Sequence, residues 1–240
     1  MTADTHRPED WGAQIQTMFS RISPRYDLMN RLMTFGQDTA WRRVVARAAA
    51  PAAGSRVLDI GAGTGGIGRE LLREATGARV VCADFTLEMM QAGRQRPGGG
   101  RLRWCAADAL QLPFGDDTFD AVVSGYLIRN VTSAAAAFGE QVRVTAPGGR
   151  VVCLDTTPPP ATLIRPLVGF FMSRVIPALG RIISGDDGAY TYLPESTQRF
   201  LTPPALAAVM RKAGLTGLKW RTLMFGTMAI HVGRKPGGRP

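Results

Sequence analysis

The chain has 240 residues, of which 45% are hydrophobic and 20% charged. This length suffices to bury one sizeable core without disulfides or metal ions, so we expect one domain with embellishments. The net charge of +10 lies mainly in residues 160–240, where 11 basic residues oppose 3 acidic ones. Basic surfaces attract nucleic acids, anionic lipids and acidic proteins alike, so charge alone does not identify a partner.

The cysteines and the chain ends give no sign of a metal site, of export or of a membrane span. Cys82, Cys105 and Cys153 lie far apart in apolar runs, without C-x-x-C spacing or histidine partners, which predicts buried thiols in a reducing compartment. The first residues lack the basic and then apolar pattern of a secretory signal. The apolar stretch 163–183 is interrupted by three arginines and two prolines, so we expect a cytoplasmic protein that does not cross a bilayer.

Residues 11–50 have the pattern of helices that precede the sheet. Ile15, Phe19 and Ile22 recur at helical spacing, and a later helix is predicted to be capped by Asp38. We therefore divide the chain into an N-terminal helical cap, residues 1–50, and a main domain, residues 51–240.

Five apolar runs then alternate with helical segments. They read RVLDIG, ARVVCADF, RLRWCAAD, FDAVVSG and GRVVCLDTT, at residues 56–61, 78–85, 101–108, 119–125 and 149–157. Alternating strands and helices predict a doubly wound α/β fold with a mostly parallel sheet, whose ligands bind at the carboxyl ends of the strands.

The pattern changes after the fifth run. Residues from about 160 to 200 are predicted to form a helical insertion, followed by a helix at 203–213 and two final strands, GLKWRTLMF and TMAIHVGR. Because little more than Gly226 separates these strands, they must pair antiparallel. A seven-stranded Rossmann-like sheet with an antiparallel last strand is similar to the class I methyltransferase fold.

The loop DIGAGTGGIG, residues 59–68, fits two ligand-binding patterns. Gly61, Gly63 and Gly66 match the G-x-G-x-x-G of a dinucleotide site, whereas Asp59, Gly61, Gly63 and Gly65 match the D-x-G-x-G-x-G of a methyl-donor site. An acidic side chain would repel a pyrophosphate, but it can hold the α-ammonium of S-adenosylmethionine. The loop therefore favours the methyl donor, with a dinucleotide-dependent reductase or a non-catalytic binding module as alternatives.

Two further acids close the next predicted strands. Asp84 ends the second strand, where its carboxylate can accept both ribose hydroxyls of either ligand. Asp108 ends the third strand, where a methyltransferase needs a carboxylate for the adenine amino group while the Ala109 amide meets the ring nitrogen. Three acids at the tips of three successive strands favour S-adenosylmethionine.

Several motifs together carry a family resemblance. The stretches MFSRISPRYDLMNRLMTFGQDTAWRR, IRNV and GAYTYLPES, with the glycine loop and ADFTLEMM, resemble the ubiquinone/menaquinone biosynthesis C-methyltransferases from Met18 to Lys235. The resemblance implies that the chain is an S-adenosylmethionine-dependent enzyme and that Tyr26, Arg129 and Asn130 face the reacting ring. It implies that Thr64, Asp84, Asp108 and Ala109 contact the donor. Phe85, Ser124 and Gly125 are further candidates for donor binding. The family often has serine where Gly125 stands, with Ser124 displaced by one position.

The implied reaction adds a methyl group to a ring carbon of a demethylmenaquinol-type acceptor, with another small phenol as the alternative substrate. Arg129 is too basic to take a proton, so we expect it to stabilise the quinol oxyanion, with water or Tyr26 passing the proton and Asn130 orienting it. Arg129 could instead form a structural salt bridge, and Tyr26 could be a packing anchor. His231 fits a packed strand residue better than a general base.

The stretch 163–183 is suited to a lipophilic acceptor. Ile164, Val168, Phe171 and Val175 share one stripe of a helical wheel, as a lip for a prenyl tail would require. The basic C-terminal third could rest on anionic lipid at the inner face of the membrane. Packing on the domain and a homodimer interface are the alternatives, and we expect neither a nucleic-acid partner nor a metal. Tyr190, Tyr192 and Glu195 are secondary site candidates, in a block that could also be a capped loop and helix start.

Overall fold

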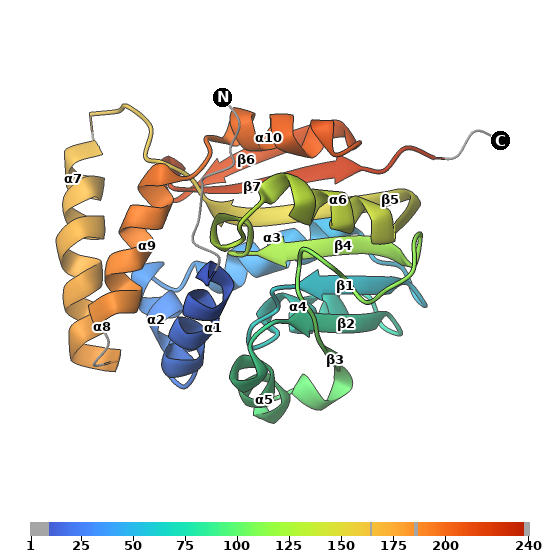
Figure 1. The fold of residues 1–240 in the computed structure, drawn as a ribbon, viewed down its shortest axis with the longest axis horizontal. Helices are drawn as coiled ribbons and strands as arrows, with labels where there is room; N and C mark the ends of the chain where they lie inside the picture. The colour runs from blue at the N-terminus through green and yellow to red at the C-terminus, as the bar shows by residue number, and fades with distance from the viewer. Residues whose placement is uncertain (1–9, 164, 185–186, 238–240) are drawn as a thin grey trace.

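The computed structural model describes residues 10–163, 165–184 and 187–237. Its centre is a seven-stranded sheet with the order β3-β2-β1-β4-β5-β7-β6 (Figure 1). The parallel strands are β1 (Arg56–Ile60), β2 (Arg79–Asp84), β3 (Arg103–Ala106), β4 (Phe119–Gly125) and β5 (Thr145–Thr156). The last strand, β7 (Met228–Arg234), runs antiparallel between β5 and β6 (Thr216–Leu223). The predicted fold class is thus confirmed.

Helices cover both faces of this sheet. One face packs against α3 (Asp38–Ala49) and α4 (Gly66–Glu74), and the other packs against α6 (Ala134–Val144) and α10 (Pro203–Lys212). The central strands are buried on both faces, so alternate residues enter different cores: Val57 joins the first and Leu58 the second. Helix α5 (Leu87–Gln95) follows β2.

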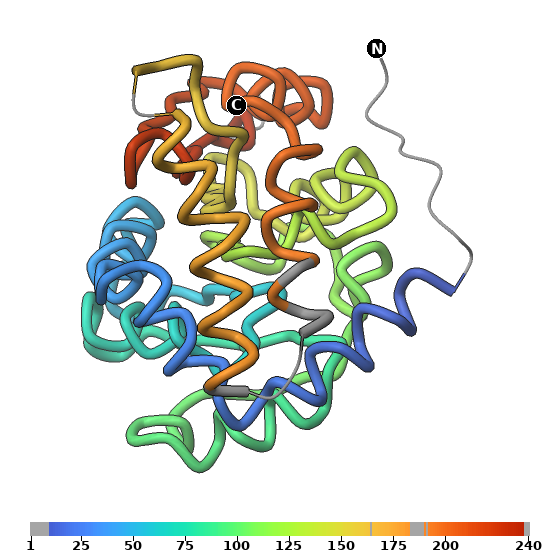
Figure 2. Tube along the Cα trace, turned by 90° about the vertical axis from the view of Figure 1, so that its left-hand side faces the viewer, coloured from blue at the N-terminus to red at the C-terminus, as the bar shows by residue number. Residues whose placement is uncertain are grey.

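A third apolar core lies beyond the carboxyl ends of the parallel strands. It joins α1 (Trp11–Ile22), α2 (Tyr26–Met33), a helical segment made of α7 (Arg165–Phe170), a π-helical turn (Phe171–Val175) and α8 (Ile176–Ser184), and α9 (Asp187–Arg199). Figure 2 shows α7, α8 and α9 side by side next to α2. The predicted insertion is therefore helical and sits over the edge where ligands of such sheets bind.

The predicted cap of α3 is wrong in detail. Asp38 is the first residue of the helix, and its backbone N–H donates to Thr34 Oγ1 at 3.2 Å. Its carboxylate instead lies 3.1 Å from Arg42 Nη2, one turn along the helix. Helix α3 packs on the sheet, whereas α1 and α2 lie beyond its edge, so the division at residues 50 and 51 stays a proposal.

Two of the three thiols are buried as expected. Cys82 and Cys153 lie in central strands, but Cys105 is half-buried because β3 is an edge strand with one neighbour. Among the described residues, no helix combines the length and the hydropathy that a transmembrane span requires.

Candidate active site

A cavity of about 90 Å³ lies at the carboxyl ends of the central strands, and we refer to it as the donor cavity. Its walls bring together six of the predicted donor-binding residues: Gly61, Gly63, Asp84, Phe85, Ala109 and Gly125. Helix α1 forms one wall of this cavity, and Gln16 Nε2 on that helix donates to the Phe85 carbonyl at 2.9 Å. The carboxyl ends of parallel strands share one edge, so residues far apart in sequence meet here.

The glycine loop follows β1 with a backbone that favours glycine. Gly61, Gly63 and Gly65 have φ angles of 62°, 55° and 73°, in the left-handed region that costs other residues energy. Gly61 also allows a close approach, because a Cβ there would lie 2.9 Å from Leu127 Cδ1. The loop thus brings its backbone against the cavity, as the methyl-donor pattern predicts.

Asp59 is the penultimate residue of β1, and its side chain is fully buried. Oδ2 accepts the Gly68 N–H at 2.9 Å, whereas Oδ1 has no hydrogen-bond partner among the described residues. Burial raises the pKa of Asp59 to about 7. The carboxylate borders a second cavity of about 20 Å³ that shares Tyr26, Gly61 and other walls with the donor cavity. A buried carboxylate oxygen without a donor is suited to a cationic group.

Asp84 ends β2 and shapes the same site. Its Oδ2 accepts the Gly63 N–H at 2.7 Å, and its Oδ1 accepts the Thr86 N–H at 2.8 Å. Each carboxylate oxygen has a second lone pair, so the side chain can fix the loop and still accept a ligand hydroxyl. Burial raises the pKa of Asp84 as well.

Four other predicted residues lie outside the donor cavity. Asp108 is exposed beyond the end of β3 and accepts the Leu110 N–H at 2.9 Å. Ser124 is buried within β4 and lines none of the described cavities. Thr64 lines the 20 Å³ cavity and donates to Asp27 Oδ1 at 2.9 Å, and Gly65 serves as the N-cap of α4. The geometry supports Ala109 more directly than Asp108 at the adenine end.

Arg129 lies on the short helical turn after β4 and is buried. Its Nη1 lies 2.7 Å from Asp155 Oδ1, and its backbone N–H donates to Asp155 Oδ2 at 3.2 Å. Burial alone would lower the pKa of Arg129, but the adjacent Asp155 carboxylate outweighs it, so the pKa is raised and the cation persists. The salt bridge considered as the alternative is therefore present, and the guanidinium also borders a large cavity.

Asn130 is held from three sides. Its Nδ2 donates to the Tyr126 carbonyl at 2.9 Å, its Oδ1 accepts the Tyr192 hydroxyl at 2.9 Å, and its carbonyl accepts Trp11 Nε1 at 2.8 Å. The side-chain amide is thus oriented by Tyr192 on α9 and by the Tyr126 carbonyl, while α1 holds the Asn130 backbone, and Asn130 lines the donor cavity. Tyr192 joins the site through this contact, whereas Glu195 is exposed on α9.

Tyr26 begins α2 and lies where three cavities meet. It borders the donor cavity, the 20 Å³ cavity and a third cavity that Arg129 and Tyr190 also line. Its ring packs edge-on against Phe19, with centroids 6.0 Å apart. Burial raises its pKa, so the phenol stays protonated at neutral pH. The structure thus supports both a packing role and a role beside the ligand.

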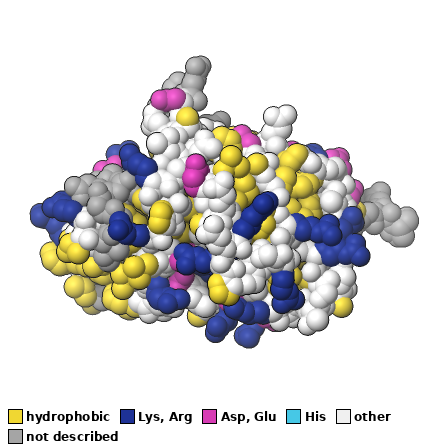
Figure 3. Space-filling view, turned by 90° about the horizontal axis from the view of Figure 1, so that it is seen from below, with side chains coloured by type: hydrophobic (Ala, Val, Ile, Leu, Met, Phe, Trp, Pro, Cys, Tyr) yellow, Lys and Arg dark blue, Asp and Glu magenta, His cyan; other side chains and the backbone are white. Residues whose placement is uncertain are grey.

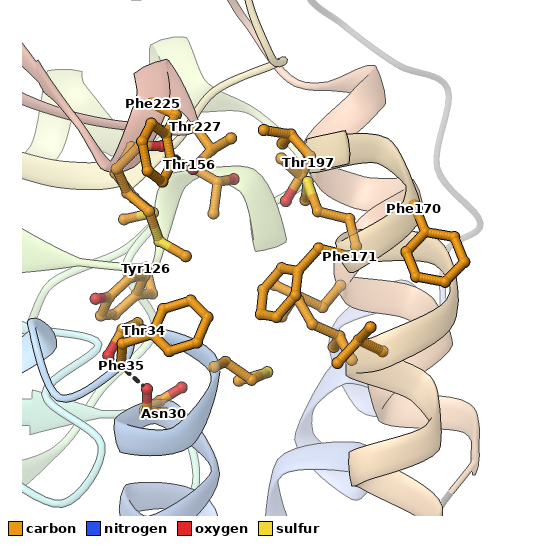
Figure 4. Close-up of a pocket in the computed structure, with 18 of the residues that line it drawn as sticks. Asn30, Thr34, Phe35, Tyr126, Thr156, Phe170, Phe171, Thr197, Phe225 and Thr227 are labelled. Atoms are coloured by element: carbon orange, nitrogen blue, oxygen red, sulfur yellow. Dashed lines mark hydrogen bonds between the residues drawn. The ribbon is translucent and has the colours of Figure 1, made fainter. Parts of the chain in front are cut away.

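The large cavity has a volume of about 480 Å³ and is lined mainly by apolar side chains. Figure 4 shows Asn30, Thr34 and Tyr126 on one side and Phe171 on the other. Val168, Phe171 and Val175 of the predicted stripe line it, so the stripe faces this apolar cavity; Ile164 lies outside the described residues. The polar floor includes Arg129. The size falls within the usual range for small-molecule sites.

His231 has the structural role predicted for it. It is buried in β7, where Nε2 lies 2.9 Å from the Pro203 carbonyl oxygen and the ring stacks on Trp220. Burial lowers its pKa, and it lines none of the described cavities.

Sequence comparison agrees with this geometry. Residues 8–235 match the model of the ubiE/COQ5 methyltransferase family. The chain belongs to this family. It is 46% identical over 225 residues to the ubiquinone/menaquinone biosynthesis C-methyltransferase UbiE of Desulfotalea psychrophila, covering 93% of this chain and 91% of that protein. It is also 46% identical to the demethylmenaquinone methyltransferase of Thermus thermophilus, covering 91% and 100% of the two chains.

Solved structures share the fold of this ubiE/COQ5 family member at low sequence identity. The [4+2]-cyclase SpnF superposes with a TM-score of 0.72 at 16% identity, covering 99% of this chain and 100% of that one. A Haemonchus contortus phosphoethanolamine N-methyltransferase, solved with S-adenosylhomocysteine, gives a TM-score of 0.61 at 16% identity, covering 82% and 52%. The shared fold is the class I methyltransferase fold.

Family membership makes the chain an S-adenosylmethionine-dependent methyltransferase, and the residue types around the donor cavity and the adjoining 20 Å³ cavity suit the polar groups of that cofactor. The unpartnered Asp59 Oδ1 can take the α-ammonium, and the Asp84 carboxylate can take the ribose hydroxyls. Phe85 and Ala109 line the same cavity and would border the adenine. The dinucleotide alternative does not account for a buried acid that lacks a donor.

Three further residues of the site are not among the predicted site residues. Tyr126 has a left-handed backbone, with φ 60°, and a buried hydroxyl without a partner among the described residues. Arg42 and Asp155 reach the site from α3 and β5. Asp155 lies near the carboxyl end of β5, where the strand-end pattern could have identified it. The positions of Arg42 and Tyr126 follow from packing between distant segments, which no local pattern reports.

Proposed function

We propose that this methyltransferase adds a methyl group to a ring carbon of a reduced quinone of the demethylmenaquinol type. The observation that carries the proposal is a buried arginine, Arg129, in the lining of a mainly apolar cavity. This cavity shares Tyr126 as a wall with the donor cavity. Such a site accepts a ring with one ionisable oxygen and a long apolar tail. The names of relatives at 41–46% identity support the same acceptor.

The residues around the acceptor ring have different roles in the reaction. S-adenosylmethionine supplies an activated methyl group when bound, so the protein must align the acceptor and increase the electron density of its ring. Arg129 does the latter by stabilising the oxyanion left when a quinol hydroxyl loses its proton. A guanidinium has five N–H donors, so the Asp155 contact and a quinol oxygen are compatible.

The proton leaves through polar groups beside Arg129. Burial raises the pKa of Tyr26, so it is present as the neutral phenol and not as a basic phenolate. Its hydroxyl can still accept one hydrogen bond and donate another as a relay to water. Asn130, held by Tyr192, orients that water or the quinol hydroxyl. Asp155 keeps Arg129 in place and ionised.

Product analysis tests the acceptor. Purified protein is incubated with methyl-labelled S-adenosylmethionine and either a short-chain demethylmenaquinol or a simple phenol of equal ring size. We expect label on a ring carbon of the demethylmenaquinol, identified by mass spectrometry and NMR. Label on a phenol oxygen, or unchanged menaquinone in a deletion strain, would contradict the proposal.

We further propose that the α7–α8 segment rests on an anionic membrane surface while the protein otherwise lies in the cytoplasm. Leu163, Leu167, Phe170 and Ile182 are at least 60% exposed there. Exposed arginines, Arg165, Arg174 and Arg181, lie on the same segment. Figure 3 shows hydrophobic side chains gathered at this end, with basic residues around them. Apolar side chains in the acyl boundary and arginines at the headgroups are the pattern of an interfacial helix.

Vesicle sedimentation tests this surface. We expect binding to vesicles with anionic lipid, weaker binding to neutral vesicles, and loss of binding in the double variant Leu167→Glu/Phe170→Glu. Lys219→Glu, a basic-to-acidic change on β6, is the control for general charge. A concentration-dependent dimer that the double variant abolishes, without vesicle binding by the wild type, would favour a homodimer interface instead.

A further inference from the structure

Arg42 brings a buried cation to the start of the glycine-loop helix. It lies on α3, its side chain is 12% exposed, and its guanidinium lines the 20 Å³ cavity beside Asp59. The absence of a side chain at Gly66 makes this possible, because a Cβ there would lie 1.9 Å from Arg42 Nη1. Gly66 is the first residue of α4, where the helix dipole also favours a negative charge.

The surrounding acids fix the guanidinium without enclosing it. Asp38 Oδ2 lies 3.1 Å from Nη2, whereas Asp27 Oδ1 is 3.9 Å from Nη1, beyond hydrogen-bond distance. Asp27 itself accepts from Thr64 Oγ1 and lies 3.3 Å from Arg96 Nη2. Arg42 is thus oriented by Asp38 and presents Nη1 toward the start of α4 and the cavity.

Two buried polar atoms border the same cavity and lack partners among the described residues. One is Asp59 Oδ1, and the other is the hydroxyl of Tyr126. In Figure 4 the Tyr126 hydroxyl points away from the apolar cavity, while its ring forms part of that cavity's wall. An unpaired acceptor and an unpaired hydroxyl, beside an oriented cation, form a site of mixed charge. This cavity adjoins the larger donor cavity through shared lining residues, so a ligand that occupies the donor cavity would place only its polar end here.

We propose that Arg42 and Tyr126 bind the α-carboxylate of the methyl donor while Asp59 binds its α-ammonium. The donor cavity and the 20 Å³ cavity share Tyr26, Gly61, Gly125 and Tyr126, so a ligand whose ribose meets Asp84 extends toward Asp59 and Arg42. A zwitterion satisfies both orphan atoms at once. When both the ammonium and the carboxylate of the donor's amino-acid group are bound, its sulfur is held next to Tyr126, the wall that the donor cavity shares with the 480 Å³ cavity.

The proposal rests on the cofactor and not on the identity of the acceptor. Its test is therefore a binding measurement without acceptor, by isothermal titration calorimetry. The two probes are S-adenosylhomocysteine and its decarboxylated analogue, S-adenosyl-3-thiopropylamine, which keeps the amine and lacks the carboxylate. The proteins are the wild type, Arg42→Met, Tyr126→Phe and the control Arg43→Met. Arg43 is the neighbour of Arg42 on α3, its side chain is 57% exposed, and it lines none of the described cavities.

We expect the wild type to prefer S-adenosylhomocysteine by about 10- to 100-fold, the usual effect of a hydrogen-bonded charge pair. Arg42→Met loses about that factor for S-adenosylhomocysteine and binds the analogue about as well as the wild type. Tyr126→Phe shows a smaller loss in the same direction, and Arg43→Met shows none. Equal affinity of the wild type for both probes, or an equal loss for both in Arg42→Met, would overturn the proposal. Failure of the wild type to bind either probe would overturn the cofactor assignment with it.

The Arg42→Met variant leaves Asp38 without its cation and could therefore fail to fold. A second variant keeps the proposal testable in that case. Gly66→Ala keeps every charge but places a Cβ where Arg42 Nη1 lies, so the flexible end of that side chain must move. We expect Gly66→Ala to weaken S-adenosylhomocysteine more than the decarboxylated probe, with little change in melting temperature. A Gly66→Ala protein that binds both probes like the wild type would place the carboxylate elsewhere.

Discussion

Both burial and ligand binding affect the ionisation of the Asp59 carboxyl group. Its pKa lies at about 7 because it is fully buried, with one oxygen bonded to Gly68 N–H and the other unpartnered. In the unfolded chain an aspartate titrates near ~3.9. Between these values the folded protein binds a proton that the unfolded protein has released, so stability falls as pH rises from about 4 to about 7 and then levels off.

The substitution Asp59→Asn removes this titration and keeps an oxygen for Gly68. From about pH 5 to about pH 8, the wild type should lose roughly 3 kcal/mol of unfolding free energy relative to Asp59→Asn, at 1.36 kcal/mol for each pKa unit. Urea unfolding at several pH values measures this difference. Parallel stability profiles for the two proteins would refute the burial argument.

The same carboxyl should link donor binding to protons. An ammonium beside Asp59 favours the ionised form, so binding of S-adenosylhomocysteine below about pH 7 releases protons and weakens as pH falls. Calorimetry in buffers of different ionisation enthalpy counts those protons. Asp59→Asn should bind the ligand far more weakly and release none; proton release that persists in this variant would assign the titration to another group.

The remaining predictions concern the ribose site and the acceptor side. Asp84→Asn should lower S-adenosylhomocysteine affinity by about 100-fold, and Asp84→Ala should also lower the melting temperature because two backbone amides lose their acceptor; calorimetry and thermal unfolding separate the effects. Arg129→Met should cost about 3–5 kcal/mol of stability by leaving Asp155 buried without its cation, and Arg129→Met/Asp155→Leu should recover most of it while staying inactive. Donor affinity should be unchanged in both, and its loss would make Arg129 structural for the donor cavity. Tyr192→Phe should reduce kcat about 10-fold without changing donor affinity, because Asn130 loses a hydrogen bond that orients it. An unchanged kcat would show that the orientation of Asn130 by Tyr192 does not contribute to catalysis.

Local sequence patterns determined most of the fold and part of the donor-binding site. Alternating strands and helices specified the sheet, and the short link between the last two strands, residues 224–227 in the structure, specified the antiparallel pair, because both depend on chain periodicity and reach. Asp59 and the glycine loop identified the donor because they lie together at the carboxyl end of a single strand. Asp84 followed from the same rule at the next strand. These features need only the geometry of neighbouring residues.

Tertiary structure decided which groups meet across the molecule. Arg42, predicted only as a helix residue, faces Asp59 because α3 packs against α4. Asp155 pairs with Arg129 because β4 and β5 are neighbours in the sheet. Neither contact could be inferred from sequence spacing, since each depends on side-chain direction and on the approach of separate elements. The ends of the strands determine where the active site lies. The packing of helices against the sheet determines which charged groups there are paired with each other and which are free to bind a ligand.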